Sequence, residues 1–383
     1  MQFVHIGDTH LGYRQYNLDE RESDIYNAFD ECIDKIIEIK PDFVVHSGDL
    51  FDSSEPSINA LYTAIKGLSK LKDHGIPLYI IHGNHDIPKR SSKRTPFSVL
   101  KKILGDYLKT FVNKKYHIIR GEKEVFIGGS DFTYRSTIDD LLKDYALIER
   151  ESRDYKDKIL LFHQSIYSYS NIPTYEIQLN DLPQGFKYYA GGHIHQRILK
   201  KLNDDANGNN GSGVLAYSGS TEIINYDEYK DYEKYGKGFY LVDLSGKDFD
   251  INNVDKINIK CRDFIINKNI MDDKLLMKLI EELESKYKPV VICSVVKGLF
   301  GRLEDVLKNR ALYSRISYIP ESTEKEIILN NQLGDIDYLF KEFLRKGNYD
   351  VNFIYGIYRE VLSEDGNLFN YLEDCYSKYR PQS

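Results

Sequence analysis

The sequence predicts a mixed α/β layer fold, and three observations support that prediction. Short apolar runs alternate with helical apolar patterns through residues 1–245, as strands and helices do in α/β domains. The later strand candidates follow one another more closely, which disfavours a pure doubly wound sheet. Polar motifs stand directly after several apolar runs, where α/β folds place their functional loops.

The first part of the chain alternates strands and helices. Apolar residues at helical spacing indicate one helix around residues 25–37 and a second from Pro56 to about residue 74. Pro41 ends the first helix, and Gly75 with Pro77 ends the second, because proline and glycine interrupt helices. Apolar runs predict strands at 3–6, 43–45, 78–81, 118–119, 125–127, 159–162, 188–190, 214–217 and 239–242.

The chain changes character after residue 245. Strand-like runs reach Ile266, and an amphipathic helix, an apolar strand over 289–296 and a further helix over 301–312 follow. We therefore expect a compact α+β module over 246–319. Residues 320–383 are polar and helical with apolar stripes, and we expect a helical tail. Asn, Asp and Gly dominate residues 203–213, which favours a flexible hairpin excursion.

Composition narrows the class of protein. A chain of 383 residues suits two or three domains, and a net charge of -7 excludes a general polyanion binder. Any nucleic-acid surface must then be a local patch. The four cysteines form no CxxC pair, which excludes a zinc knuckle and favours a reducing cytoplasm. The sequence contains neither a signal peptide nor a long apolar run, so we expect a cytoplasmic protein without membrane contact.

Five short polar motifs each follow an apolar run. Each motif alone has an ordinary explanation. A D-x-H triplet arises about once by chance in such a chain, and Gly-Asn readily forms a turn. A single histidine is often a buried structural residue. Together, and in this order, they point to one site at the ends of the strands. The motifs are Gly7-Asp8-Thr9-His10, Gly48-Asp49-Leu50-Phe51-Asp52, Gly83-Asn84-His85-Asp86, Phe162-His163-Gln164 and Gly191-Gly192-His193-Ile194-His195.

The residue types in these motifs match a hard-to-borderline metal site. Carboxylate, imidazole and amide ligands without cysteine suit Mn, Fe or Zn. His193 and His195, two residues apart, would point the same way on a strand. The candidates are too many for one ion but fit two ions that share a carboxylate, an arrangement suited to in-line displacement at phosphorus. They are Asp8, His10, Asp49, Asn84, His163, His193 and His195.

The motif order resembles the calcineurin-like metallophosphoesterase superfamily. Within it, the stretch DTHLGY from Asp8, the stretch GDLFDSSEPS from Gly48 and Ser218-Gly219-Ser220 are similar to the DNA double-strand-break repair nucleases of the meiotic recombination eleven/SbcD family. The resemblance is specific up to about Ser220. It implies a four-layer α-β-β-α sandwich, with 246–319 as a capping domain that shapes a DNA groove.

The resemblance also implies an assignment of ligands and roles. One metal would take Asp8, His10, Asp49 and His195, and the other would take Asp49, Asn84, His163 and His193, with two Mn²⁺ per chain. His85 matches the catalytic histidine that is not a ligand. Asp52 stands where the repair nucleases often have His and matches the broader phosphoesterase pattern. We hypothesise that the Asp52 side chain hydrogen-bonds His85 and raises its basicity.

A basic run beside the third motif is a candidate DNA contact. It could hold phosphates without reading sequence, or it could simply be a solvated helix start. The residues are Lys89, Arg90, Ser91, Ser92, Lys93 and Arg94.

Two kinds of protein partner follow from the resemblance. Helices near 56–74 and 95–105 would form a homodimer, although they could merely cover the sheet. The tail would dock an SMC-like coiled-coil ABC ATPase, although it could pack back on the chain. No GxxxxGK[ST] motif is present, so any ATP use would belong to that partner.

The sequence therefore predicts a Mn-dependent DNA nuclease in double-strand-break repair, with 3′-5′ exonuclease activity on duplexes and endonuclease activity on single strands. The chemistry follows from the residues, and the substrate, the polarity and the location on the chromosome follow from the resemblance. One alternative is a phosphomonoesterase or cyclic-nucleotide phosphodiesterase, which the basic run and appended modules disfavour. Another is a catalytically silent DNA- or ATPase-binding scaffold, which the complete ligand set disfavours and metal analysis would test.

Overall fold

The computed structural model describes residues 1–88, 95–121, 123–167, 175–202, 213–246, 249–319, 344 and 354–355. Contacts divide the chain into two units. The first comprises Met1–Ser294 with Gly301–Ile316, and the second comprises Val295–Phe300 with Ser317–Ser383. The architecture described below belongs to the first unit, together with the strand and helix ends that continue into the second.

Two six-stranded sheets form the centre of the first unit. The first sheet has the order β12-β11-β1-β2-β3-β4 and the second has the order β5-β6-β7-β8-β10-β9. The strands of the first sheet are β1 (Gln2–Ile6), β2 (Phe43–His46), β3 (Leu78–Ile80), β4 (Leu108–Thr110), β11 (Lys237–Asp243) and β12 (Val254–Ile259). Those of the second are β5 (Tyr116–Ile119), β6 (Val125–Gly129), β7 (Asp157–Phe162), β8 (Tyr188–Gly191), β9 (Ile198–Leu202) and β10 (Gly213–Tyr217).

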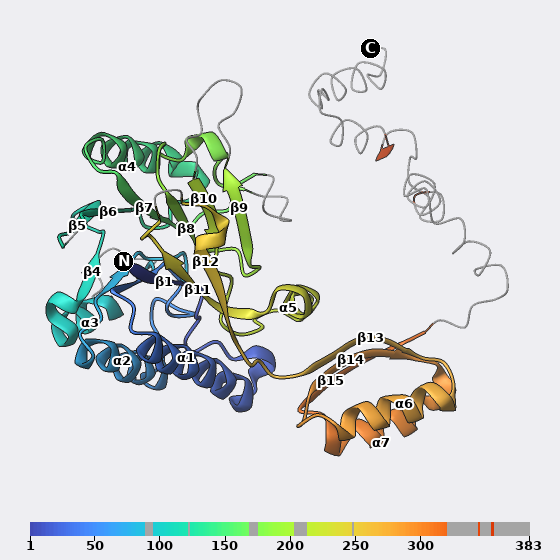
Figure 1. Ribbon diagram of the computed structural model, residues 1–383. Helices are drawn as coiled ribbons and strands as arrows, with labels where there is room; N and C mark the ends of the chain where they lie inside the picture. Colours follow the sequence, from blue (N-terminus) through green and yellow to red (C-terminus); the bar gives the residue numbers. More distant parts are fainter. Residues whose placement is uncertain are drawn as a thin grey trace, which may run out of the picture. The chain divides into compact units, whose positions relative to one another are not determined.

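The two sheets pack face to face with helices outside them. Buried side chains from both sheets, including Phe3, Val45, Ile127 and Leu161, form the central core. Helices α1 (Asp19–Ile39), α2 (Ile58–Asp73) and α3 (Pro96–Leu104) cover the first sheet, and α4 (Ile138–Glu151) covers the second. Figure 1 shows these four layers in order. The predicted α-β-β-α sandwich is confirmed.

Local signals explain where the covering helices begin and end. Acidic residues occupy the first turn of α1, where their negative charges interact favourably with the positive end of the helix dipole. The helix ends at Ile39, and Lys40, in the left-handed conformation with φ 55°, caps it directly before Pro41. The Ser57 hydroxyl accepts a hydrogen bond from the Ala60 N–H at 3.1 Å and caps α2.

A smaller α+β module follows β12. Its three strands have the order β13-β14-β15, formed by Phe264–Ile270, Val290–Val295 and Tyr313–Tyr318. Helices α6 (Asp273–Glu284) and α7 (Phe300–Arg310) accompany them (Figure 1). β12 lies within the stretch expected to open this module, but it pairs with β11 and extends the first sheet.

A short helix leads into the first sheet's strand β11. The helix α5 (Tyr229–Tyr235) follows a 3-10 turn over Tyr226–Glu228 and precedes β11. No helix in the described ranges combines the length and apolar character that crossing a membrane requires.

Candidate metal centre

The candidate ligands lie in loops at the carboxyl ends of the parallel strands of both sheets. Asp8 and His10 follow β1, Asp49 follows β2, and Asn84 follows β3. His163 follows β7, and both His193 and His195 follow β8. Because parallel strands end at a common edge, these five loops can meet there. All seven side chains fall into two neighbouring clusters.

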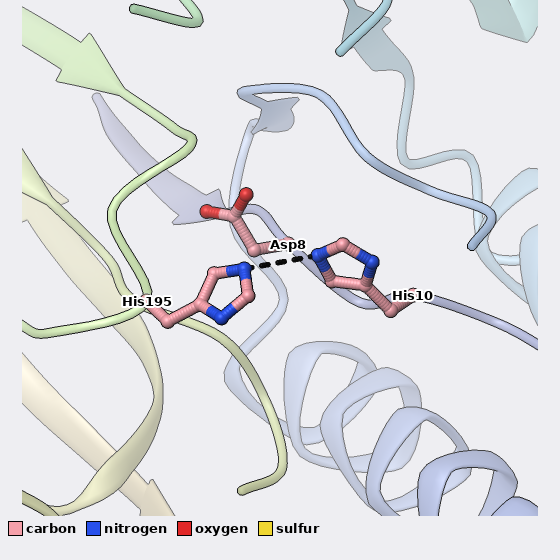
Figure 2. Close-up of side chains that lie close together, drawn as sticks. All are labelled: Asp8, His10 and His195. Atoms are coloured by element: carbon pink, nitrogen blue, oxygen red, sulfur yellow. Dashed lines mark hydrogen bonds between the residues drawn. The ribbon is translucent and has the colours of Figure 1, made fainter. Parts of the chain in front are cut away.

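The first cluster consists of Asp8, His10 and His195, whose ligand atoms lie within 4.8 Å of one another. Figure 2 shows the two imidazole rings beside the carboxylate, meeting through their nitrogen atoms, with His10 Nε2 and His195 Nε2 3.1 Å apart. The Asp8 Oδ1 atom accepts from the His193 N–H at 2.9 Å. Its Oδ2 atom is buried and has no hydrogen-bond partner among the described residues. A cation would supply that partner, so the donor set fits a metal ion.

The second cluster consists of Asp49, His163 and His193, again within 4.8 Å. His163 Nε2 lies 3.2 Å from Asp49 Oδ2. The Asn84 Oδ1 atom joins this group, 3.1 Å from His163 Nε2 and 2.9 Å from His193 Nδ1. His193 and His195 lie beyond the end of β8 and enter different clusters, so the expectation that they point the same way on a strand is wrong.

Asp49 lies between the two clusters. Its Oδ2 atom is 3.2 Å from His163 Nε2 in the second cluster and 3.7 Å from His10 Nε2 in the first. The side chain is almost fully buried, so no solvent separates it from either neighbour. This carboxylate therefore borders both clusters.

The backbone around the centre is strained. Four candidate ligands have positive φ angles: Asp8 at 50°, His10 at 44°, Asp49 at 52° and His193 at 80°. Such conformations cost free energy in residues other than glycine and persist where the surrounding structure enforces them, most often at functional sites.

Close packing against glycine also defines the second cluster. A Cβ atom on Gly83 would collide with the Asp49 carboxylate and main chain. A Cβ atom on Gly192 would collide with the Ser47 carbonyl and the His163 ring. Glycine is required at both positions because main chain and ligands approach too closely for any side chain.

Each cluster has an outer partner that orients a histidine. His163 Nδ1 lies 2.7 Å from the Ser47 carbonyl oxygen, and His195 Nδ1 lies 2.8 Å from Glu228 Oε1. An Nδ1–H donated outward leaves Nε2 free to face the cluster. Lys237 in turn donates to Glu228 Oε2 at 2.6 Å.

Sequence reasoning missed Glu228. This residue ends a 3-10 turn that does not directly follow an apolar strand, so the pattern that locates the other site residues does not reach it. Its pairing with His195 joins residues 33 positions apart and arises only from the tertiary fold.

The electrostatics of the second cluster favour positive charge. Burial would raise the pKa of Asp49, but His163, His10 and His85 hold it below its usual range. Burial would lower the pKa of His163, yet the adjoining Asp49 carboxylate raises it to about 9. Burial and the neighbouring His163 lower the pKa of His193 to about 3. A positive charge beside Asp49 is thus favourable, and a divalent cation would supply one.

His85 lies beside both clusters with its side chain 40% exposed. The main-chain N–H of His85 donates to Asp49 Oδ1 at 2.9 Å, and the centroid of its ring is 4.8 Å from that of His10. His85 Nδ1 donates to the carbonyl oxygen of Asp52 at 2.8 Å. The Asp52 carboxylate lies 3.8 Å from that nitrogen and 3.3 Å from His10 Nδ1.

The predicted side-chain hydrogen bond from Asp52 to His85 is therefore corrected. The main-chain carbonyl makes that contact, and the carboxylate instead faces His10, a candidate ligand. The atoms of His10, Asp52 and His85 also come within 4.8 Å of one another, so Asp52 borders the first cluster.

Asp86, the last residue of the third motif, has a role that was not assigned from the sequence. Its buried carboxylate accepts from the N–H groups of Leu50, Phe51 and Gly83 at 3.2, 3.0 and 3.0 Å. It thereby ties the loop after β2 to the loop after β3. Burial, followed by the charge on Asp49, raises the pKa of Asp86 to about 6.

Three sets of predicted residues lie outside the described residues. They are the basic run from Lys89 to Arg94, nearly all of the hairpin segment 203–213 and almost all of the tail over 320–383.

Residues 1–197 match the family model of the calcineurin-like phosphoesterases, which spans all seven candidate ligands. The chain is therefore a calcineurin-like phosphoesterase, and the predicted class of hydrolase is confirmed. Over nearly its full length it is similar to proteins named DNA double-strand break repair protein Mre11. The relative from Methanococcus maripaludis is 50% identical over 381 residues, covering 98% of this chain and 99% of the relative.

Two further relatives of the same name extend the comparison. The protein from Methanocaldococcus jannaschii is 42% identical, covering 99% of this chain and all of the relative. The protein from Saccharolobus solfataricus is 38% identical and covers 90% of both chains. The chain belongs to the Mre11 family of DNA double-strand break repair proteins, as the motifs predicted.

Proposed function

We propose that the chain is a Mn-dependent DNA nuclease that acts in double-strand-break repair. It would degrade duplex DNA from the 3′ end and cut single strands internally, using two Mn²⁺ per chain. The observation that carries this proposal is the pair of clusters that meet at Asp49 in a chain of the Mre11 family. The relatives' printed name supports DNA as the substrate.

The donor set supports the two-metal assignment. Asp8, His10, Asp49 and His195 would hold one ion, and Asp49, Asn84, His163 and His193 the other. Oxygen and imidazole donors without sulfur suit manganese. When bound, such a pair polarises the phosphoryl oxygens and lowers the pKa of coordinated water.

His85 is the group of this chain best placed to handle a proton. It lies outside both ligand sets and is partly exposed to solvent. The Asp52 carbonyl accepts its Nδ1–H, which fixes the ring and leaves Nε2 available. When Nε2 is also protonated, the imidazolium would donate a hydrogen bond from Nε2 to the phosphate or pass that proton to the leaving oxygen. Asp52, through its carbonyl and its carboxylate, would position His85 and His10.

Three domains follow from this proposal. Residues 1–245, whose first sheet β12 extends, would form the nuclease domain, and the rest of 246–319 would form the capping domain that shapes the DNA groove. Residues 320–383 would form a tail that binds an SMC-like coiled-coil ABC ATPase. The three-stranded module with α6 and α7 supports the second. The basic run Lys89–Arg94 would contact DNA phosphates beside the centre, and the protein would work inside the cell on the chromosome.

Exposed apolar side chains on α2 and α3 support a homodimer. Ile58 is 87% exposed and Tyr62 is 66% exposed on α2, and Val99 and Ile103 are 40% and 39% exposed on α3. Large apolar residues gathered on neighbouring helices mark an interaction surface. Light scattering at micromolar concentration should give a dimer for the wild type and a monomer for Ile58→Asp. A monomeric wild type would contradict this proposal.

Digestion of end-labelled linear duplex DNA tests the nuclease function. Wild type should shorten the DNA in manganese and not in EDTA, and the label gives the polarity. His85→Ala should lose about 10²- to 10⁴-fold in rate. His74→Ala, at the exposed end of α2, is the matched control and should keep full activity.

The same experiment separates the alternatives. Wild type that holds two metals per chain yet leaves DNA intact would overturn the nuclease proposal. Hydrolysis of a small phosphomonoester or a cyclic nucleotide by that protein would then identify a different phosphoesterase. Failure on every substrate would identify a silent scaffold.

Salt dependence tests the basic run. Changing Lys89 and Arg90 to Ala should make the decrease of DNA affinity with salt shallower, because fewer counterions are released on binding. An unchanged slope would remove these residues from the DNA surface.

A further inference from the structure

A cavity of about 460 Å³ adjoins the first metal-ligand cluster. We propose that it binds one unpaired nucleotide at the end of a DNA strand; this inference rests on the proposed nuclease function and names its substrate more closely. We refer to it as the tyrosine cavity. Its walls include Tyr13, Tyr16, Tyr226, His195, Ile292 and Arg315.

The tyrosine cavity begins at the metal centre. His195 belongs to the first cluster and also lines the cavity. Tyr13 follows His10 in the same loop, and its N–H donates to the His10 carbonyl at 2.9 Å. A group held in the cavity therefore lies next to the ligands of one proposed metal.

Both parts of the first unit contribute to the walls. Tyr13, Tyr16 and Tyr226 come from the domain that carries the metal centre, whereas Ile292 and Arg315 come from β14 and β15 of the smaller module. The rings of Tyr16 and Tyr313 stack at 3.8 Å with an angle of 2° between their planes. This stack joins the two sides of the cavity.

Tyr16 has the features of a functional residue rather than a simple packing residue. Its backbone adopts the left-handed region with φ 59°, which costs free energy for a tyrosine. Its hydroxyl is buried and has no hydrogen-bond partner among the described residues. An unpaired buried hydroxyl beside a cavity is ready to bond a polar group of a ligand.

The chemistry of the walls indicates the class of ligand. Tyrosine rings stack on nucleobases of any sequence. Arg315 is exposed, and no salt bridge pairs it with an acid in the described part of the chain. A free guanidinium suits a phosphate. Glu228, which also faces the cavity, is already paired with Lys237 and His195, so its charge is balanced against an incoming anion.

Size restricts the ligand to a single nucleotide. The volume falls in the range of small-ligand pockets, and a duplex cannot enter it. A base within a duplex has its faces covered by its neighbours, and only a base that has left the stack can present a face to a tyrosine. The cavity therefore selects ends whose last nucleotide is unpaired, and such ends should be cut faster than fully paired G·C ends.

Fluorescence of 2-aminopurine tests binding without cleavage. The probe is a duplex with an unpaired 2-aminopurine at one end, mixed with the full chain in EDTA. Stacking should quench the fluorescence. Tyr226→Leu should lose most of the quenching, and Tyr226→Phe, which keeps the ring, should retain it. Tyr287→Leu, an 82% exposed tyrosine elsewhere on the smaller module, is the matched control. Thermal unfolding identifies any variant that fails to fold.

Kinetics on two substrates test the phosphate contact. Bis(p-nitrophenyl) phosphate needs the metal centre but has no base for the cavity. For Arg315→Ala, the rate on DNA with an unpaired end should fall about tenfold relative to the rate on this small diester. Arg315→Lys should recover part of the loss. Arg310→Ala, on α7 of the same module, should not change the ratio.

The outcomes distinguish this proposal from the nuclease function. Equal quenching by wild type and Tyr226→Leu, or an unchanged ratio for Arg315→Ala, would overturn the cavity's role. Quenching in EDTA without any cleavage in manganese would overturn the nuclease function and leave the nucleotide site supported.

Discussion

The two metal-ligand clusters differ in what holds them in place. In the second cluster, His163 donates to the main-chain carbonyl of Ser47, and Gly83 and Gly192 pack directly against the ligands. In the first, His195 donates to the Glu228 side chain, which Lys237 also holds. The second cluster is thus fixed by the main chain, whereas the first depends on charged side chains brought from far along the chain. Substitution of a supporting residue should therefore weaken the first cluster in part, whereas it should disrupt the second cluster.

Metal binding should have the largest effect, because it acts on both clusters. Each ion that binds only the folded chain adds about 2.7 kcal/mol when its concentration is 100 times its dissociation constant, so two ions add about 5 kcal/mol. Thermal unfolding in manganese and in EDTA measures this gain. His163→Ala and His195→Ala should each remove one part of it. If the unfolding temperature were the same with and without manganese, neither metal site would exist.

Gly83→Ala should break the second cluster. The added Cβ would displace the Asp49 carboxylate, so we expect the rate of DNA cleavage to fall by about 10²-fold or more, equivalent to about 3 kcal/mol. Metal analysis after dialysis should find less than two ions per chain. Gly301→Ala is the matched control, because nothing lies within 4 Å of a Cβ at that position. A full metal content in Gly83→Ala would show that the main chain can move.

Glu228→Gln should adjust the first cluster without breaking it. Loss of a carboxylate that orients a metal-bound histidine typically lowers metal affinity about 10- to 100-fold. Titration with Mn²⁺ should therefore separate one weakened site from one unchanged site. Asp227→Asn, at the neighbouring exposed acid, should leave both sites unchanged. If both sites weakened equally in Glu228→Gln, the distinction between the clusters would be lost.

The strands that the sequence predicted best are the buried parallel ones. β1, β2 and β7 each contain a short run of buried apolar residues, because both faces of each strand are covered. β4 and β9 escaped prediction: β4 has three residues, and β9 contains two exposed lysines. Both lie at sheet edges, where one side of the strand has no neighbouring strand. The apolar pattern that marks a buried strand in the sequence is therefore weak in β4 and β9.

The centre was predictable to the extent that its residues follow strands. The seven candidate ligands stand in short motifs after apolar runs, so the sequence places them at one edge. Glu228 has no such marker, and its partner is distant in sequence. The contact between His85 and Asp52 uses a main-chain carbonyl. Every residue has such a carbonyl, so the amino-acid type at position 52 does not predict the contact.

The position of β1 has a consequence for biosynthesis. This strand, the first to be made, lies between β2 and β11, and its Gln2 pairs with Asp243. At about 5–20 residues per second, the ribosome makes β11 on the order of 10–50 s after β1. One edge of the nascent strand stays open throughout that interval, and strand edges of this kind invite pairing with other chains. His195 and Glu228 are also made late. The first cluster and its partner Glu228 are therefore complete, and able to hold a metal ion, only after about three fifths of the chain has been translated.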